Sequence, residues 1–107
     1  MNYPPLPWLQ FVILSAIQDN PLVWVTGKVI RATMAEDGVK RAGPAFYQIM
    51  GRIEEAKLVE GENYDRLEER QKGKQRICER RYKLTDRGIM ALDRTRRAYG
   101  RTKCRRA

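Results

Sequence analysis

The chain has 107 residues, enough for one domain with one hydrophobic core. It contains 42% hydrophobic and 33% charged residues, and its 22 Lys and Arg exceed its 13 Asp and Glu, which leaves a net charge of +9. The absence of His excludes imidazole general bases, Ser-His and Cys-His catalytic pairs and His-ligated metals. Cys78 and Cys104 are too few for a structural zinc site. We therefore expect reduced thiols, no metal and no cofactor.

The net positive charge is confined to the second half of the chain. Residues 1–60 carry six basic and six acidic side chains, whereas residues 61–107 carry sixteen basic and seven acidic ones. A neutral half joined to a basic half predicts a polyanionic partner, nucleic acid before an acidic membrane surface. The apolar run at 8–17 has no basic residue before it and is too short to cross a bilayer. We expect a cytoplasmic, nucleoid-associated protein without a membrane partner.

Two helices are predicted in the first third of the chain. The first begins at Trp8 after a Pro-rich lead-in and is apolar nearly all round, so we expect the helix in the core or against a partner, and Trp8 itself in the core. Residues 19–21 end it, and a short extended segment follows. Thr26 is placed to cap the second helix and Gly38 to stop it. The inner stripe of this second helix is expected to be Val29, Ile30 and Met34.

A third helix is predicted from Gly43 and Pro44 to about Lys57, because proline is favoured in the first turn of a helix. Its apolar residues recur at helical spacing and define one inner face. These are Phe46, Ile49, Met50 and Ile53.

Beyond the third helix, the sequence predicts a hairpin and a last helix. A strand at 58–64 and a strand at 77–84 are separated by a charged, Gly-containing loop at 66–75. Cys78 is expected on the packed face of the hairpin. Thr85 is placed to cap the fourth helix, which we expect Gly100 to end.

These elements predict a mainly α fold with a small β-hairpin, in one domain over residues 1–99. Residues 100–107 form a basic tail that we expect to be disordered when free. Three helices, a two-stranded hairpin and a further helix are the layout of a winged helix-turn-helix domain.

Two segments resemble the PadR-type transcriptional regulators. The segment AFYQIMGRIEEAKLV at 45–59 is similar to their recognition helix, and RYKLTDRG at 81–88 is similar to the motif that closes their wing. The resemblance implies that the third helix enters the major groove and that the hairpin, the wing, lies along the DNA backbone or the minor groove. We expect the longer C-terminal dimerisation helix of that family to be shortened or absent here.

Candidate DNA-binding residues follow from this layout. Gln suits adenine and Arg suits guanine in the major groove, and the segment 70–83 carries seven basic side chains against one acid. We predict contacts from the third helix (Ala45, Tyr47, Gln48, Arg52), the wing (Lys72, Lys74, Gln75, Arg76), the second helix and following turn (Lys28, Lys40, Arg41) and the tail (Arg101, Lys103, Arg105, Arg106).

The sequence thus favours a small transcriptional regulator that binds double-stranded DNA sequence-specifically. We expect a homodimer through the first helix, with the fourth helix as a second candidate surface. The alternatives are a winged-helix module that binds an acidic protein, and an RNA-binding protein that uses the tail. Trp24 is expected to fill the core, with a ligand or partner contact as its alternative. No nucleophile-base pair, phosphate loop or carboxylate-rich metal cluster can be assembled, so no enzyme is expected.

Overall fold

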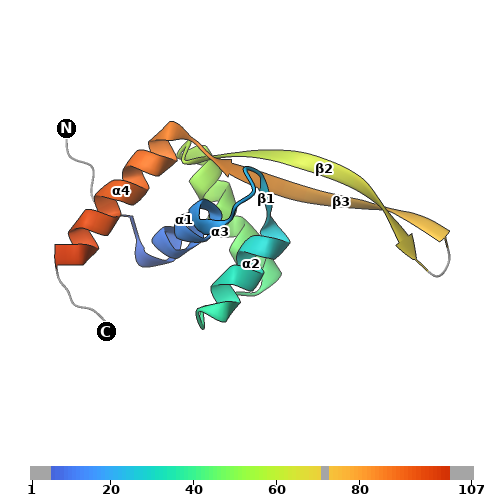
Figure 1. Ribbon diagram of the computed structural model, residues 1–107, viewed down its shortest axis with the longest axis horizontal. Coiled ribbons are helices and arrows are strands. Elements are labelled where there is room, and N and C mark those ends of the chain that lie inside the picture. Colours follow the sequence, from blue (N-terminus) through green and yellow to red (C-terminus); the bar gives the residue numbers. More distant parts are fainter. Residues whose placement is uncertain (1–5, 71–72, 102–107) are drawn as a thin grey trace.

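A computed structural model describes residues 6–70 and 73–101, with the backbone alone for residues 70, 100 and 101. Within these residues, four helices flank a three-stranded antiparallel sheet of order β1-β3-β2 (Figure 1). The elements are α1 (Trp8–Asp19), β1 (Val25–Thr26), α2 (Gly27–Glu36), α3 (Gly43–Glu55), β2 (Val59–Arg70), β3 (Gly73–Leu84) and α4 (Asp86–Arg101). The predicted fold class and order of elements are confirmed.

The helix α1 packs against α2, α4 and β3 at the centre of the core. Its buried residues begin only at Ile13 and continue through Leu14 to Ile17. Trp8 was expected in the core and is 55% exposed, so that prediction is wrong. Leu6 and Leu9, on either side of Trp8, pack against the core, so Trp8 lies on the outer side of the first turn.

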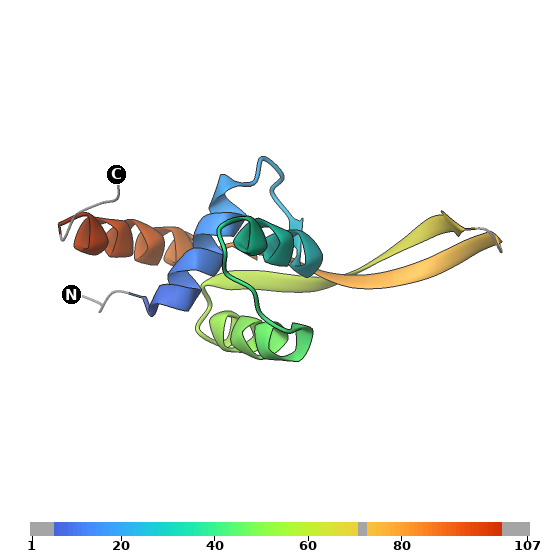
Figure 2. The same cartoon turned by 90° about the horizontal axis from the view of Figure 1, so that it is seen from below.

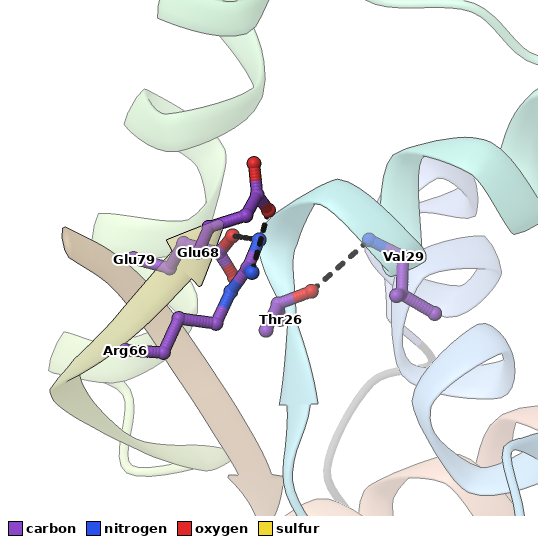
Figure 3. A network of polar contacts seen from close by, with 5 residues as sticks. All are labelled: Thr26, Val29, Arg66, Glu68 and Glu79. Carbon is purple, nitrogen blue, oxygen red and sulfur yellow. Dashed lines mark hydrogen bonds and ion pairs between the residues drawn. The ribbon is translucent and has the colours of Figure 1, made fainter. Parts of the chain in front are cut away.

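The start of α2 has the predicted cap, since the Thr26 hydroxyl accepts a hydrogen bond of 3.3 Å from the Val29 backbone N–H (Figure 3). Ile30 and Met34 are fully buried, whereas Val29 is 39% exposed and does not belong to the inner stripe. Ile30 and Met34 are four residues apart and share one face, and Val29 lies about 100° round the helix from Ile30. After α2, Gly38 has a φ of 83°, as a helix-ending glycine should.

The helix α3 begins with Pro44 in its first turn, as predicted. Phe46, Met50 and Ile53 are fully buried, and Ile49 packs at the edge of the core. This inner face fixes the orientation of α3, whose opposite face lies at the surface of the molecule (Figure 2).

The hairpin is longer and more regular than predicted. Its two strands pair continuously from Val59 opposite Leu84 to Arg70 opposite Gly73, so the expected charged loop at 66–75 is wrong. The outer part of the hairpin, residues 65–69 and 73–78, is largely polar and solvent-exposed on both faces. Its sequence therefore lacks the alternation of apolar and polar residues that would predict a strand. The hairpin projects from the helical body and lengthens the molecule to 54 × 31 × 25 Å (Figures 1 and 2).

The hairpin leads into α4 through Thr85. The Thr85 hydroxyl accepts a hydrogen bond of 3.0 Å from the Gly88 N–H and donates one of 2.6 Å to the Lys57 carbonyl. A Cβ on Gly88 would overlap the Leu58 carbonyl oxygen, so glycine is required there. The predicted cap is confirmed, but α4 continues through Arg101, so Gly100 does not end it. The predicted tail from residue 102 lies outside the described residues.

The far end of α4 is joined to the start of the described chain. The Leu6 N–H donates to the buried Thr95 hydroxyl at 2.9 Å, and the Tyr99 hydroxyl donates to the Leu6 carbonyl at 3.0 Å. The rings of Phe11 and Tyr99 meet edge to face at 5.0 Å between centroids. These contacts hold the C-terminal part of α4 against α1 and against Leu6, which precedes it.

Candidate nucleic-acid interface

The exposed face of α3 brings together the residues predicted to read DNA bases. Ala45, Gln48 and Arg52 are spaced at i, i+3 and i+7, and all three are exposed. They lie opposite the buried residues Phe46 and Met50. The helix therefore presents the Gln48 amide, the Arg52 guanidinium and the small side chain of Ala45 along one outward stripe.

Tyr47 is held more tightly than its three predicted companions. Its side chain is 42% exposed, and its ring meets that of Phe46 edge to face at 5.0 Å. The ring also covers Gly27 at the start of α2, where a Cβ would lie 2.5 Å from the Tyr47 hydroxyl oxygen. Tyr47 thus packs α3 against α2 with one side and meets solvent with the other.

The turn between α2 and α3, residues 37–42, carries two of the predicted backbone-contacting cations. Lys40 and Arg41 are exposed, and the Arg41 guanidinium donates to the Lys40 carbonyl at 2.7 Å. Arg31 on α2 donates through Nη2 to the Arg41 carbonyl at 3.3 Å. Lys28, at the other end of α2, is also exposed. No salt bridge within residues 6–70 and 73–101 involves any of these four cations.

Most of the described cations of the hairpin, unlike those of the turn, form ion pairs with carboxylates. Arg66 bonds Glu68 at 2.7 Å and Glu79 at 2.9 Å (Figure 3). The other pairs within the described chain are Arg76–Asp65 at 2.5 Å, Arg80–Glu54 at 2.8 Å, Arg81–Glu62 and Lys83–Glu60 at 3.8 Å. Of the five cations of 70–83 whose side chains the structure describes, four are thus paired with acids from β2 and α3.

The Arg80–Glu54 pair joins the hairpin to the end of α3. Arg80 donates to both carboxylate oxygens of Glu54, from Nε at 3.1 Å and from Nη2 at 2.8 Å. It also donates from Nη1 to the Asn63 side-chain oxygen at 2.9 Å. The carboxylate lies over Gly61, where a Cβ would be 2.8 Å from it. This bidentate contact raises the pKa of Arg80 and fixes the angle between helix and hairpin.

Solved structures share this arrangement of helices and hairpin. F93 from STIV, a winged-helix DNA-binding protein, has a TM-score of 0.64 at 16% identity, covering 99% of this chain and 100% of that one. PadR of Bacillus subtilis, solved with operator DNA, has a TM-score of 0.63 at 15% identity, covering 97% of this chain and 51% of that one. A PadR family regulator from Eggerthella lenta has a TM-score of 0.59 at 18% identity, covering 84% and 70%.

The chain has the winged-helix fold. The predicted resemblance to PadR-type regulators is thus confirmed at the level of the fold. The sequence itself matches no family profile and no curated protein. In the terms of this fold, the β2–β3 hairpin is the wing, and we use that name for it below.

The base of the wing carries a cluster of aromatic and cationic side chains. The Arg81 guanidinium lies 4.9 Å from the ring centroid of Trp24 and 4.6 Å from that of Tyr64, and the Lys83 amine lies 5.0 Å from the Trp24 ring. Trp24 is half-buried beneath these two cations, so it covers the sheet beside β1 rather than filling the core as expected. Tyr82 on β3 is buried in the core, and burial raises its pKa to about 12.

The outer wing includes three more of the predicted contacts. Lys74, Gln75 and Arg76 are exposed, and Arg76 is held by Asp65. Cys78 was expected on the packed face and is exposed instead, so that prediction is wrong. At this point both faces of the hairpin meet solvent, and neither packs on the hydrophobic core. A hydrogen bond between the Cys78 thiol and Asp65, with the negative charge of that carboxylate, raises the pKa of Cys78.

Several predicted residues fall outside the described part. They are Lys72, Lys103, Cys104, Arg105 and Arg106, together with the side chain of Arg101. Among the described residues, none of the helices is long and apolar enough to cross a membrane. Residues 6–70 and 73–101 also contain no cluster of Cys, Asp and Glu that could hold a metal ion.

Arg31 is the residue of this region that the sequence did not single out. Nothing in the sequence indicates that the turn after α2 folds back over it. The contact with the Arg41 carbonyl, ten residues later, exists only in the folded chain.

Proposed function

We propose that this protein is a small transcriptional regulator that binds double-stranded DNA in a sequence-specific manner, with α3 in the major groove. The observation that carries the proposal is the exposed stripe of Ala45, Gln48 and Arg52 on a helix whose other face is fixed in the core. Gln and Arg can each make paired hydrogen bonds to one base, adenine or guanine respectively. A non-enzymatic role agrees with neighbours that are transcription factors.

The surroundings of the stripe fit the same proposal. Lys28, Lys40 and Arg41 lie on α2 and on the turn that precedes α3, where they can contact phosphates on either side of the groove. Glu54, which would repel DNA if free, is held by Arg80 at the far end of α3. The outer wing adds Lys74, Gln75 and Arg76 as backbone or minor-groove contacts, and the basic tail is proposed as a further contact with phosphates.

A homodimer is part of the proposal. Trp8 at the start of α1 and Met90 on α4 are more than half exposed, and Ile89 is 39% exposed. Exposed apolar groups on these two helices offer a surface that a second copy can cover. Equilibrium sedimentation of the full chain tests this, and a single species of monomer mass at high micromolar concentration would contradict it.

The proposed function is tested by fluorescence anisotropy with the duplex upstream of the protein's own gene, a scrambled duplex and a single-stranded RNA, each at two salt concentrations. We expect the upstream duplex to bind at least about 10³-fold more tightly than the scrambled one. Arg52→Ala should remove about 1–3 kcal/mol of binding free energy and relax the preference at one base pair. Arg97→Ala on α4 is the control, since it removes one exposed cation distant from α3 in the sequence.

Equal, steeply salt-dependent binding to all three nucleic acids would contradict sequence-specific recognition. It would instead favour the basic tail as a general anchor for RNA or another polyanion. Absence of binding to any of them at moderate salt would favour the protein-interaction alternative.

A further inference from the structure

A cationic hollow lies between α2 and the turn that leads into α3. It has a volume of about 440 Å³ and is lined by Arg31, Ala35, Lys40, Arg41 and Ala42. Three of these five residues are cations and none is an acid. The two alanines provide the space, because longer side chains at those positions would fill it. We call this cavity the Arg31 hollow.

The fold of the turn creates the hollow. Gly38, in its left-handed conformation, reverses the chain at the end of α2, and Val39 is buried directly after it. The Val39 N–H donates to the Met34 carbonyl at 2.9 Å, which completes the turn. Lys40 and Arg41 are thereby brought back beside Arg31, and all three line the hollow.

The hydrogen bonds of the hollow leave its cations without a counter-charge. Arg31 and Arg41 each donate to a backbone carbonyl of the turn, so neutral groups hold the two guanidinium groups in place. The Nε atom of Arg31 is buried and has no hydrogen-bond partner. A buried donor on a charged group is costly when it has no hydrogen-bond partner, so a ligand that brings an acceptor to this atom would be stabilised.

The start of α3 lies beside the hollow and adds to its preference for anions. Ala42, the cap residue of this 13-residue helix, makes no side-chain cap bond, and the first turn of α3 contains no acid. The free N–H groups and the positive end of the helix dipole therefore favour negative charge at this place.

We propose that the Arg31 hollow is a phosphate-binding site, with Arg31 as its inner ligand and Lys40 and Arg41 at its rim. Several donors converge there, and a phosphate group has enough oxygens to accept from all of them. The phosphate comes from one of two sources, the DNA backbone next to α3 or a free phosphorylated molecule. If the phosphate belongs to DNA, the inference deepens the proposed function and rests on it. The existence of a phosphate-binding site does not depend on the proposed function.

The direct test is an NMR titration of the nitrogen-15-labelled full chain with inorganic phosphate, at constant ionic strength set with chloride. We expect the Arg31 Nε–H signal to shift and saturate at millimolar phosphate, while that of Arg97 stays in place. The Arg31→Lys variant assigns the signal by losing it. A wild-type Arg31 signal that responds no differently to phosphate and chloride would overturn the site, and this measurement needs no variant to fold.

Duplex binding by Arg31→Lys then separates the two sources, with Arg97→Lys as the matched control. A loss of roughly five- to tenfold in duplex affinity, with phosphate as a competitor, identifies the DNA backbone as the source. Unchanged duplex affinity with a saturable Arg31 shift identifies a free phosphorylated ligand.

The site and the proposed function can fail separately. If the wild type binds no duplex while Arg31 still titrates with phosphate, the proposed function is wrong and the site stands. If it binds the upstream duplex tightly but Arg31 does not titrate, the site is overturned and the function stands.

Discussion

The wing and the α2–α3 turn are both rich in cations, yet they hold them in opposite ways. In the wing, Arg66, Arg76, Arg80 and Arg81 each contact a carboxylate. In the turn, guanidinium groups are held by backbone carbonyls, and no described carboxylate pairs with Lys40 or Arg41. The formal charge of a segment is therefore a poor guide to the charge that a ligand meets. In the wing, the cations mainly form ion pairs that hold the two strands together. In the turn, the cations have no acidic partner within the described chain and can contact a negatively charged ligand.

The largest effect should come from neutralising the turn. In Lys40→Gln/Arg41→Gln, two phosphate contacts are lost, so the slope of log affinity against log salt should become shallower by about 0.9 for each. Affinity for the upstream duplex should fall roughly tenfold at moderate salt. The measurement is anisotropy over a series of salt concentrations, with circular dichroism to confirm folding.

The matched control for the turn is the wing variant Arg66→Gln/Arg81→Gln, which changes the formal charge by the same amount. Because both arginines already have carboxylate partners, its salt slope should stay close to that of the wild type. An equal change of slope in the two variants would erase the distinction between the regions.

A smaller effect is expected where the wing meets α3. The Glu54–Arg80 contact is bidentate and partly shielded, with side chains 26% and 36% exposed. A double-mutant cycle with Glu54→Gln and Arg80→Gln should give a coupling of about 0.5–1 kcal/mol in the free energy of unfolding. Chemical denaturation of the four proteins measures it.

Two comparisons sharpen this cycle. Gly61→Ala should weaken the same contact without removing a charge, because the new methyl group pushes the Glu54 carboxylate away. The exposed Asp65–Arg76 pair, treated by the same cycle, should show no measurable coupling. A coupling at Asp65–Arg76 as large as at Glu54–Arg80 would mean that burial and bidentate geometry do not distinguish them.

The pairing in the wing also explains where sequence reasoning succeeded and where it failed. Local signals were sufficient for the helices, since the caps at Thr26 and Thr85 and the first turn at Pro44 depend on residues within four positions. The wing depends on distant partners, such as Glu54 and Arg80, which are 26 residues apart. Counting charges along 70–83 omits the acids that β2 and α3 bring to the same place.

The candidate site divides in the same way. The outward stripe of α3 was predictable, because helical spacing places Ala45, Gln48 and Arg52 opposite the apolar residues. The Arg31 hollow was not, because it depends on how the chain folds back after Gly38. The burial of Trp8 was misjudged because α1 is apolar nearly all round, so its periodicity does not show which side faces the core, and Leu6 and Leu9 pack there instead.

The smallest expected effect on DNA binding comes from a substitution of Asp65. Unlike the Lys40 and Arg41 substitutions, it should strengthen binding. Asp65 pairs with Arg76, which lowers its own pKa, and through a hydrogen bond it raises the pKa of Cys78. The Asp65→Asn variant removes a negative charge from the wing and releases one exposed cation. If the wing lies along DNA, affinity for the duplex should rise slightly and the salt slope should become steeper by about 0.9.

The reactivity of the Cys78 thiol provides a control within the same variant. Without the Asp65 charge the thiolate of Cys78 is less disfavoured, so its pKa should fall and its reaction with a disulfide reagent at mildly alkaline pH should speed up. A faster thiol reaction proves that the local charge has changed, whatever happens to binding. If the thiol responds while the salt slope stays constant, Arg76 does not reach the DNA, and the outer wing serves only to complete the hairpin. If both respond, the pairing of wing cations is what limits their contribution to binding, and the contrast with the turn is one of degree.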